Sequence, residues 1–134
     1  MEENSAMNAY VACGTTGKAV LALNGVTVQS AFKIIMTNKR ENRGLSSVGL
    51  NTFRMLFRDV KRTIVDEVSM LSSDLLRQMD MRFREIRASK MTDPFEGFGV
   101  IFCGDLRQLP PVRASVVYKR SRSGPTIYNT SVLP

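Results

Sequence analysis

The sequence predicts an α/β fold in which a parallel sheet carries helices on both faces. Three short apolar runs, at residues 8–13, 63–65 and 98–103, are separated by stretches in which apolar residues recur at helical spacing. Strands that alternate with helices form right-handed crossovers, and such crossovers build parallel sheets. Ligands of these sheets bind beyond the carboxyl ends of the strands. The polar residues that follow each run are therefore the candidate functional residues.

The first half of the chain predicts a strand, a short helix, a loop and a second helix. The run at 8–13 ends at Gly14, and residues 17–23 form a helix that Asn24 and Gly25 terminate. Residues 37–47 are polar and basic, which is typical of a loop. Residues 51–60 predict an amphipathic helix. Its expected apolar stripe is Leu50, Phe53, Leu56, Phe57 and Val60, and Arg54 and Arg58 are expected to face water.

The second half predicts a central strand, a helix, a turn and a further strand. Residues 63–65 are largely β-branched and lead directly into Asp66 and Glu67. Ser72 or Ser73 is expected to cap the next helix. A turn at 93–97 precedes the run at 98–103, which Gly104 and Asp105 terminate. The expected apolar stripe of the helix is Leu75, Leu76, Met79, Phe83 and Ile86.

The composition excludes several classes of chemistry. The 134 residues suit one domain, and the absence of His excludes Ser-His-Asp and Cys-His catalysis by this chain alone. Two Cys cannot form a four-cysteine zinc site, and Cys13 and Cys103, which end apolar runs, are expected to be buried. The apolar runs are too short to span a membrane, and the acidic first residues do not resemble a leader. We expect an intracellular chain with free thiols and no membrane contact.

The positive charge is concentrated near the C-terminus. The chain has 19 Lys and Arg against 12 Asp and Glu, a formal net charge of +7. Residues 51–105 are neutral overall, whereas residues 106–134 contain five basic side chains and no acidic one. A basic surface favours nucleic acid through the release of counterions. A solvated face or an unfolded basic tail explains the same charge equally well.

The string at residues 14–19, Gly-Thr-Thr-Gly-Lys-Ala, matches only part of a triphosphate-binding pattern. It lies between a predicted strand and a predicted helix, as a Walker A loop does. That pattern requires glycine where the chain has Ala12 and a hydroxyl where it has Ala19. Thr16, Gly17 and Lys18 are still expected to bind a single anion, because free N–H groups and a lysine converge there.

Asp66 and Glu67 are the stronger signal for chemistry. An apolar strand that delivers two adjacent carboxylates to the end of a parallel sheet is typical of a Walker B motif. The first carboxylate then helps to hold Mg²⁺, and the second orients or deprotonates the attacking water. Two solvated or helix-capping acids would give the same pattern. The most specific string is residues 104–112, in which Gln108 offers a neutral amide before a rigid Pro-Pro exit.

Four strings, taken together and in order, resemble the Pif-one/RecD-like superfamily 1 DNA helicases. The resemblance implies a partial RecA-like (P-loop NTPase) motor domain over residues 1–112 that lacks the Walker A strand. Residues 113–134 would then be a basic C-terminal segment that begins the continuation. The implied activity is ATP-dependent 5′ to 3′ translocation on single-stranded DNA with duplex unwinding, using Mg²⁺ and ATP. The strings are Thr16-Gly17-Lys18-Ala19, residues 25–32, Ile64-Val65-Asp66-Glu67-Val68-Ser69-Met70 and residues 98–112.

The resemblance also implies roles for individual residues. Asp66 would bind Mg²⁺, Glu67 would activate water, and Gln108 would sense the γ-phosphate on a loop supported by Asp105. The DNA backbone would be contacted by Thr16, Gly17, Lys18, Thr27, Gln29 and Ser30. The family usually has His where this chain has Gln29, although an amide can also donate to phosphate. The family favours Gly where this chain has Glu96, in a loop that we expect to tolerate it.

The resemblance further implies what the chain does alone. The Walker A segment of the family precedes the first strand, and its second motor domain, with the arginine fingers, would follow Pro134. Loss of an arginine finger alone lowers the rate by about 10³ to 10⁵, so we expect the isolated chain to be inactive or nearly so. The strand at 98–103 would become an exposed apolar edge, which predicts poor solubility. An intracellular location, nuclear in a eukaryote, and roles in DNA repair, recombination or telomere maintenance follow from the family only.

Two other functions fit part of the sequence. A non-catalytic nucleic-acid-binding remnant of such a helicase would keep the DNA-facing strings and the basic segment. A P-loop kinase or unrelated NTPase would explain Asp66 and Glu67 but would leave the string at 108–111, Gln-Leu-Pro-Pro, unexplained.

Overall fold

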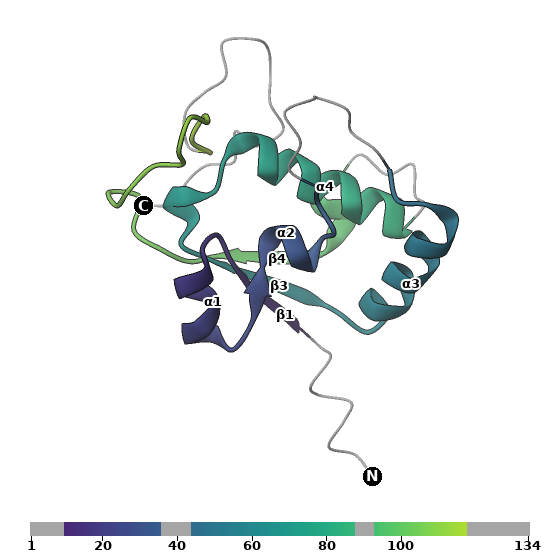
Figure 1. Ribbon diagram of the computed structural model, residues 1–134. Helices are drawn as coiled ribbons and strands as arrows, with labels where there is room; N and C mark the ends of the chain where they lie inside the picture. The colour runs from purple at the N-terminus through teal and green to yellow at the C-terminus, as the bar shows by residue number, and fades with distance from the viewer. Residues whose placement is uncertain (1–9, 36–43, 88–92, 118–134) are drawn as a thin grey trace.

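The computed structural model describes residues 10–35, 44–87 and 93–117. Within these ranges four parallel strands form one sheet in the order β2-β1-β3-β4 (Figure 1). This arrangement confirms the predicted parallel α/β fold. The fourth strand was not predicted, since β2 is only two residues long and carries no apolar run. The strands are β1 (Tyr10–Gly14), β2 (Val26–Thr27), β3 (Arg62–Asp66) and β4 (Gly99–Phe102).

The helices begin where side chains cap their first turns. Helix α1 has the predicted bounds, and the Ser72 hydroxyl accepts from the Leu75 N–H at 3.1 Å at the start of α4, as expected. Helix α3 begins earlier than predicted, because Ser46 accepts from the Gly49 N–H at 3.2 Å. The predicted loop at 37–47 lies mostly outside the described residues, and Ser47 belongs to α3. The helices are α1 (Gly17–Leu23), α2 (Val28–Ala31), α3 (Ser47–Phe57) and α4 (Ser73–Arg87), with short 3-10 turns η1 (Val68–Met70) and η2 (Pro94–Gly97).

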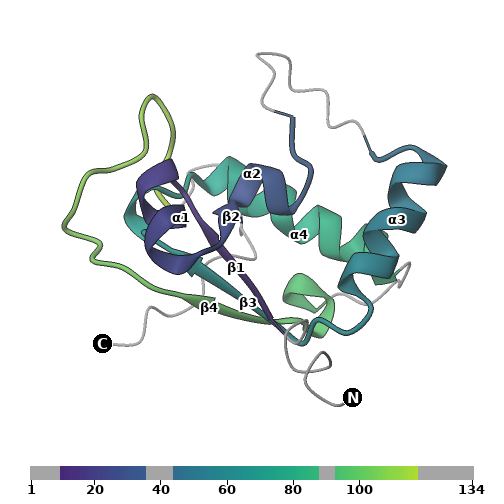
Figure 2. The same cartoon turned by 60° about the horizontal axis from the view of Figure 1, so that its bottom comes forward.

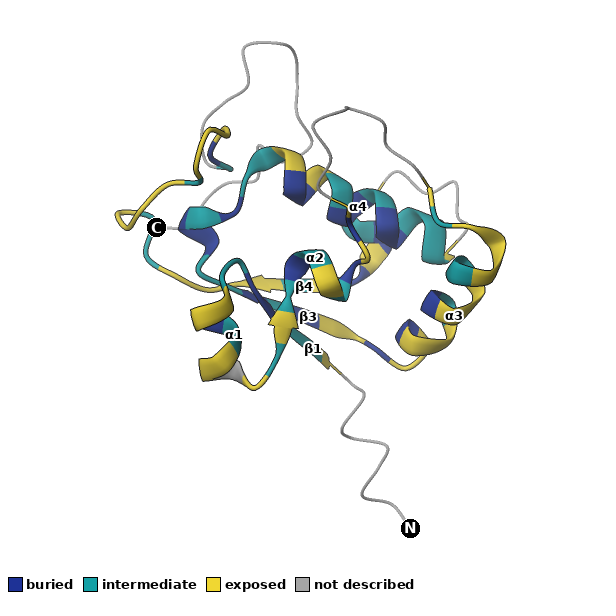
Figure 3. Cartoon of the chain, viewed as in Figure 1, coloured by how far each residue is buried: buried dark blue, intermediate teal, exposed yellow. Residues whose placement is uncertain are grey.

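One face of the sheet, which we call the covered face, carries most of the core. Side chains at the paired positions Cys13 and Val65 point to this face and are fully buried. Helices α2 and α4 lie over it, α3 packs against α4, and Figure 3 shows buried residues on all three helices. Phe83 of α4 stacks on Phe98 at 4.6 Å between ring centroids and meets Phe32 edge-on at 5.1 Å. Burial of these aromatic side chains is the main source of stability in the described part of the chain.

The opposite face, which we call the open face, is covered mainly by α1. Figure 2 shows α1 in front of the strands and α4 behind them, as right-handed crossovers require. The side chains of Ala12, Ile64 and Ile101 point to the open face, and Ile101 is 45% exposed. Helices therefore lie on both faces as predicted, but their coverage of the two faces is unequal.

Strand β4 forms one edge of the sheet in the described part of the chain. Its Phe102 is 39% exposed in addition to Ile101. The expected exposed apolar edge is thus present, while the poor solubility that it implies stays a prediction. No helix in the described ranges is long and apolar enough to cross a membrane.

Three expectations about burial are wrong. Leu56 is 61% exposed, because it lies outside the arc of α3 that meets α4. Arg54 does not face water alone: its guanidinium donates to the carbonyl oxygens of Glu85 at 3.0 Å and Ile86 at 3.1 Å. These bonds satisfy carbonyl groups at the end of α4. Cys103 is exposed rather than buried, because β4 is an edge strand.

The turn around Glu96 accommodates this side chain, as expected. Glu96 is buried, with φ 51°, and its Oε1 lies 3.2 Å from the Arg84 guanidinium. Arg84 also lies 2.8 Å from Asp80, whose Oδ1 accepts from the Phe95 N–H at 2.7 Å. A positive φ explains why glycine suits this position. The turn accommodates Glu96 through a buried ion pair and not through exposure.

Candidate active site

The candidate residues meet along one edge of the sheet, where the carboxyl ends of the strands lie. Gly14, at the end of β1, pairs with Thr27 of β2 on one side and with Asp66 of β3 on the other. The segment after β4 is held against β3, because the Cys103 N–H donates to the Val65 carbonyl at 2.8 Å. The order along the edge is therefore residues 27–30, 15–18, 66–67 and 104–108.

Asp66 and Glu67 lie at the centre of this edge and are both half-buried. Asp66 is the last residue of β3, and its Oδ1 accepts from the Glu67 N–H at 2.8 Å. Glu67 adopts a left-handed conformation, φ 57° and ψ 49°, which non-glycine residues rarely do. This turn ends the strand abruptly.

The segment after β4 fits closely against Glu67. Gly104 has φ 136°, and a Cβ atom there would lie 3.0 Å from the Val68 nitrogen and 3.2 Å from the Glu67 Cα. The Val68 N–H donates to the Cys103 carbonyl at 3.0 Å. A glycine is required at this approach because a side chain would push the two loops apart.

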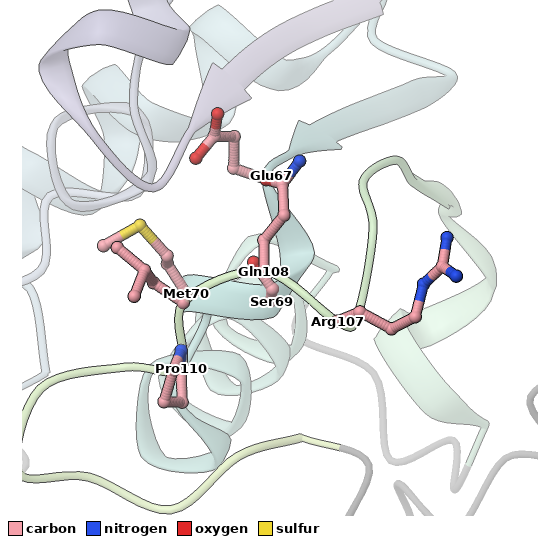
Figure 4. A pocket seen from close by; sticks show the side chains of 7 residues that line it. Glu67, Ser69, Met70, Arg107, Gln108 and Pro110 are labelled. Carbon is pink, nitrogen blue, oxygen red and sulfur yellow. The ribbon is translucent and has the colours of Figure 1, made fainter.

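Asp105 shapes the loop that carries Gln108. Its Oδ1 accepts from the Arg107 N–H at 2.9 Å, and its carbonyl accepts from the Gln108 N–H at 3.1 Å. The Arg107 guanidinium lies 3.1 Å from Oδ1, and this side-chain hydrogen bond, followed by the backbone one, lowers the pKa of Asp105. Arg107 is thereby directed away from Glu67 (Figure 4). Asp105 therefore supports the geometry of the loop without itself lining the hollow that Gln108 lines.

A hollow of about 480 Å³ opens between Glu67 and the loop after β4. Figure 4 shows the side chains of Glu67 and Gln108 near each other, with the Met70 side chain opposite Gln108. The Ser69 hydroxyl is buried at its wall and has no hydrogen-bond partner in the described part of the chain. Sequence reasoning missed Ser69, although it lies within the string that follows Asp66 and Glu67. The lining residues are Glu67, Ser69, Met70, Arg107, Gln108, Leu109 and Pro110.

The predicted DNA-contacting residues form a neighbouring group at the ends of β1 and β2. Thr16 caps α1 by accepting from the Ala19 N–H at 3.2 Å, and Thr27 caps α2 by accepting from the Ser30 N–H at 3.2 Å. The Thr27 hydroxyl also donates to the Ser30 hydroxyl at 3.0 Å. Gly17, Lys18 and Ser30 are exposed, and Gln29 is half-buried.

The connection between β1 and α1 is too short to enclose a triphosphate. Only Thr15 and Thr16 separate the two elements. A Cβ atom on Gly14 would lie 2.9 Å from the Ala19 Cβ, so α1 starts directly against the strand. This geometry agrees with the mismatch of the string at 14–19 to a Walker A loop. Thr15 is one of the polar residues after the first strand that the sequence marks as candidates, and its hydroxyl donates to the Glu67 carbonyl at 3.1 Å, a contact that the sequence did not predict.

The donor set at Asp66 suits a magnesium ion bound with a nucleotide. No cluster of three or more metal-binding side chains occurs among the described residues. Mg²⁺ does not need one, since it commonly takes one or two carboxylates together with substrate phosphates and waters. Asp66 Oδ1 is fixed by the Glu67 N–H, which orients the carboxylate for that use.

The parallel sheet, with Asp66 and Glu67 ending a central strand beside the Gln108 loop, defines a RecA-like α/β domain. Comparison of the sequence with protein families identifies the family. The family model described as PIF1-like helicase matches residues 3–129, and the chain belongs to that family. This membership excludes the alternative of an unrelated kinase.

Relatives of this chain are named ATP-dependent DNA helicases. The PIF1 helicase of Saccharomyces cerevisiae is 38% identical over 100 residues, which are 73% of this chain and 11% of that protein. The PIF5 helicase of Trypanosoma brucei brucei is 37% identical over 73% of this chain and 10% of its own length. The chain thus spans about a tenth of these relatives.

Solved Pif1 structures share the fold. Pif1 from Bacteroides in complex with ADP-AlF3 and single-stranded DNA is 34% identical, with a TM-score of 0.61. The match covers 77% of this chain and 24% of that one. Unliganded Bacteroides Pif1 is 31% identical, with a TM-score of 0.64 over 80% of this chain and 25% of the other. Nucleotide and single-stranded DNA are therefore ligands of a protein with this fold.

Proposed function

We propose that this chain carries the catalytic and DNA-contacting edge of an ATP-dependent helicase that moves 5′ to 3′ on single-stranded DNA and unwinds duplexes. The observation that carries the proposal is the order of the loops along the sheet edge. Asp66 and Glu67 lie between the hydroxyl- and lysine-bearing ends of β1 and β2 and the Gln108 loop after β4. The same end of the sheet would thereby carry both the contact with the DNA backbone and the centre that hydrolyses ATP.

On the nucleotide side, Asp66 would hold Mg²⁺ and Glu67 would orient or deprotonate the attacking water. Mg²⁺ would supply charge stabilisation to the transferred phosphoryl group. Gln108 would contact the γ-phosphate, because its amide lies across the hollow from Met70 on the side of Glu67. Asp105 acts indirectly, since its bonds to Arg107 and to the Gln108 backbone set the shape of the loop.

On the DNA side, Thr16, Gly17, Lys18, Thr27, Gln29 and Ser30 would contact the phosphate backbone. Hydroxyl, amide, lysine and backbone N–H donors position a strand without reading its bases. These contacts are independent of sequence, so binding to single strands should be weak and sensitive to salt. An intracellular location, nuclear in a eukaryote, and roles in repair, recombination or telomere maintenance accompany this function in the proposal.

The DNA contact is tested by fluorescence anisotropy of a labelled oligo(dT) with the 134-residue chain over a series of salt concentrations. Lys18→Ala should weaken binding and reduce the magnitude of the salt slope by about 0.7. Lys61→Ala is the matched control. Lys61 is an exposed lysine just before β3, at the amino ends of the strands and so away from the candidate DNA contact. Binding that survives Lys18→Ala but is lost when residues 118–134 are removed would assign the contact to the basic segment. That truncation keeps Val116 and its bridge to Ser72.

The metal contact is tested with Mn²⁺ and ADP as probes in place of Mg²⁺ and ATP. Paramagnetic broadening of the Glu67 amide signal is expected in the wild-type chain and in Asp59→Asn, an exposed aspartate on the α3–β3 connection. Asp66→Asn should abolish it. Equal broadening in both variants would contradict the role of Asp66.

Hydrolysis by the isolated 134-residue chain is expected to stay at background, because the string at 14–19 does not form a triphosphate cradle. This outcome alone would also fit a non-catalytic DNA-binding remnant. Turnover that Glu67→Gln abolishes would overturn the expected inactivity of the isolated chain.

A further inference from the structure

A side-chain hydrogen bond joins the connection that leads into the DNA-contacting group to the main chain of Glu67. The Thr15 hydroxyl donates to the main-chain carbonyl of Glu67 at 3.1 Å, across 52 positions of sequence. Thr15 is half-buried and directly precedes Thr16, the cap of α1. The bond therefore runs from the β1–α1 connection to the residue expected to activate water.

The carbonyl that accepts this bond belongs to a tightly held peptide. The Met70 N–H also donates to it, at 3.0 Å, and the Glu67 N–H is bound by Asp66 Oδ1 at 2.8 Å. Gly104 lies against the Glu67 Cα on the other side. The left-handed conformation of Glu67 is thus maintained by contacts from several segments. A change in one of these contacts alters where the carboxylate points.

Thr15 contacts Glu67 from a different segment of the chain than the other contacting residues do. The bonds from Asp66 and Met70 come from the segment of Glu67 itself, and Gly104 comes from the segment after β4. Thr15 comes from the connection that leads into Thr16, Gly17 and Lys18. These three residues lie one to three peptide units from Thr15, so a strand bound there would act on Thr15 over a short length of chain.

We propose that Thr15 is a positioning residue that couples occupation of the DNA-contacting group to the orientation of Glu67. This inference rests on the proposed function, because it assumes that a single strand binds at Thr16–Lys18. It deepens that function by naming the route through which DNA regulates the hydrolytic carboxylate. The direct contact is one hydrogen bond between two neighbouring strand ends, and no long pathway is needed.

The test is a titration of the ¹⁵N-labelled 134-residue chain with oligo(dT), followed by amide NMR signals. In the wild-type chain the signals of Glu67 and Val68 should shift with the same midpoint as those of Gly17 and Lys18. Thr15→Val removes the hydroxyl at constant shape and should reduce the Glu67 shift at least threefold, while Gly17 still responds. Thr15→Ser should restore the wild-type response.

Thr52→Val is the matched control. Thr52 also donates its hydroxyl to a carbonyl, that of Val48 at 3.0 Å, but on the exposed side of α3. This variant should titrate like the wild-type chain. A general effect of losing a threonine hydroxyl would appear in both variants and would overturn the assignment to Thr15.

The possible failures are distinguishable. If Gly17 and Lys18 shift in the wild-type chain while Glu67 does not, the coupling is overturned and the DNA contact stands, whether or not any variant folds. If no signal near Gly17 shifts, the proposed DNA contact fails, and the coupling fails with it. If Thr15→Val leaves the Glu67 shift at its full size, the coupling takes another route and the role of Thr15 is overturned.

Discussion

The two faces of the sheet contribute differently to this molecule. On the covered face, Phe32, Phe53 and Phe83 are fully buried between α2, α3 and α4. On the open face, Ile101 is 45% exposed and α1 is a short helix over β1 and β2. Burial of apolar area is the main stabilising contribution to folding, so the covered face determines stability. The edge that carries the candidate site lies where the two faces meet, on a sheet that is well covered on one face only.

The largest expected effect separates the two faces directly. Phe83→Ala should lower the free energy of unfolding by about 3–5 kcal/mol, because its ring is fully buried against four other phenylalanine rings. Ile101→Ala on the open face should lower it by less than about 1 kcal/mol, since the side chain remains partly hydrated. Urea unfolding followed by circular dichroism measures both. Equal losses would show that the open face is covered in solution.

The two cysteines provide a chemical measure of the same contrast. Burial raises the pKa of Cys13 from its ordinary 9.0 to about 12. The thiolate of Cys13 is therefore scarcer at pH 8 than that of an ordinary cysteine by a factor of roughly 10³. Cys103 is exposed at the end of β4.

One equivalent of a thiol reagent such as Ellman's should thus react rapidly with the native chain, and the second only on unfolding. Cys103→Ser should remove the rapid phase, and Cys13→Ser should leave it. A rapid phase that persists in Cys103→Ser would show that Cys13 is accessible.

The contribution of an ion pair to stability should likewise depend on whether the pair is buried or exposed. Arg84 neutralises two buried carboxylates, Asp80 at 2.8 Å and Glu96 at 3.2 Å, and joins α4 to η2. Arg84→Met should cost about 3 kcal/mol, because it leaves Asp80 and Glu96 buried without this partner. Arg58→Met is the control, since Arg58 pairs with Asp59 at 3.5 Å on the surface and the loss should be below about 1 kcal/mol. Similar losses in a urea titration would contradict the burial of the Asp80 and Glu96 carboxylates.

The fold was largely predictable because its signals are local. The bounds of α1, the cap at Ser72 and the buried stripe of α4 follow from residues close together in sequence. Strand β2 was missed because it is defined by pairing with β1 and not by its own composition. Cys103 and Leu56 were misplaced because burial depends on what lies across from a residue. An apolar run does not show that its strand is an edge.

The candidate site was predictable as strings but not as contacts. Asp66, Glu67 and Gln108 stand in recognisable strings, and the register of the strands brings those strings to one edge. The contact that Thr15 makes and the position of Ser69 at the hollow were not predicted, because each depends on a group that sequence spacing cannot locate. Thr15 meets a carbonyl 52 positions away, and the Ser69 hydroxyl is buried at the wall of a hollow formed by another loop.

The smallest expected effect concerns Asp105, whose ion pair is the exposed counterpart of the Arg84 cluster. The hydrogen bonds from Arg107 hold the pKa of Asp105 below its ordinary value of 3.8. A carboxyl whose pKa is lower in the folded state contributes stability above its unfolded pKa, and loses it as the pH falls through the folded one. The loop around Gln108 is therefore fully supported at neutral pH and loosens only in acid.

Arg107→Gln tests this contribution, since it removes the guanidinium while keeping the backbone N–H that Asp105 also accepts from. A ¹³C NMR titration of the Asp105 carboxyl should give a midpoint below 3.8 in the wild-type chain and a higher midpoint in the variant. The rise should be incomplete, because the backbone bond remains and independently favours the ionised carboxylate. Identical midpoints would mean that the backbone bond alone holds the loop. In that case the exposed guanidinium of Arg107 is free to meet a ligand at the Gln108 loop.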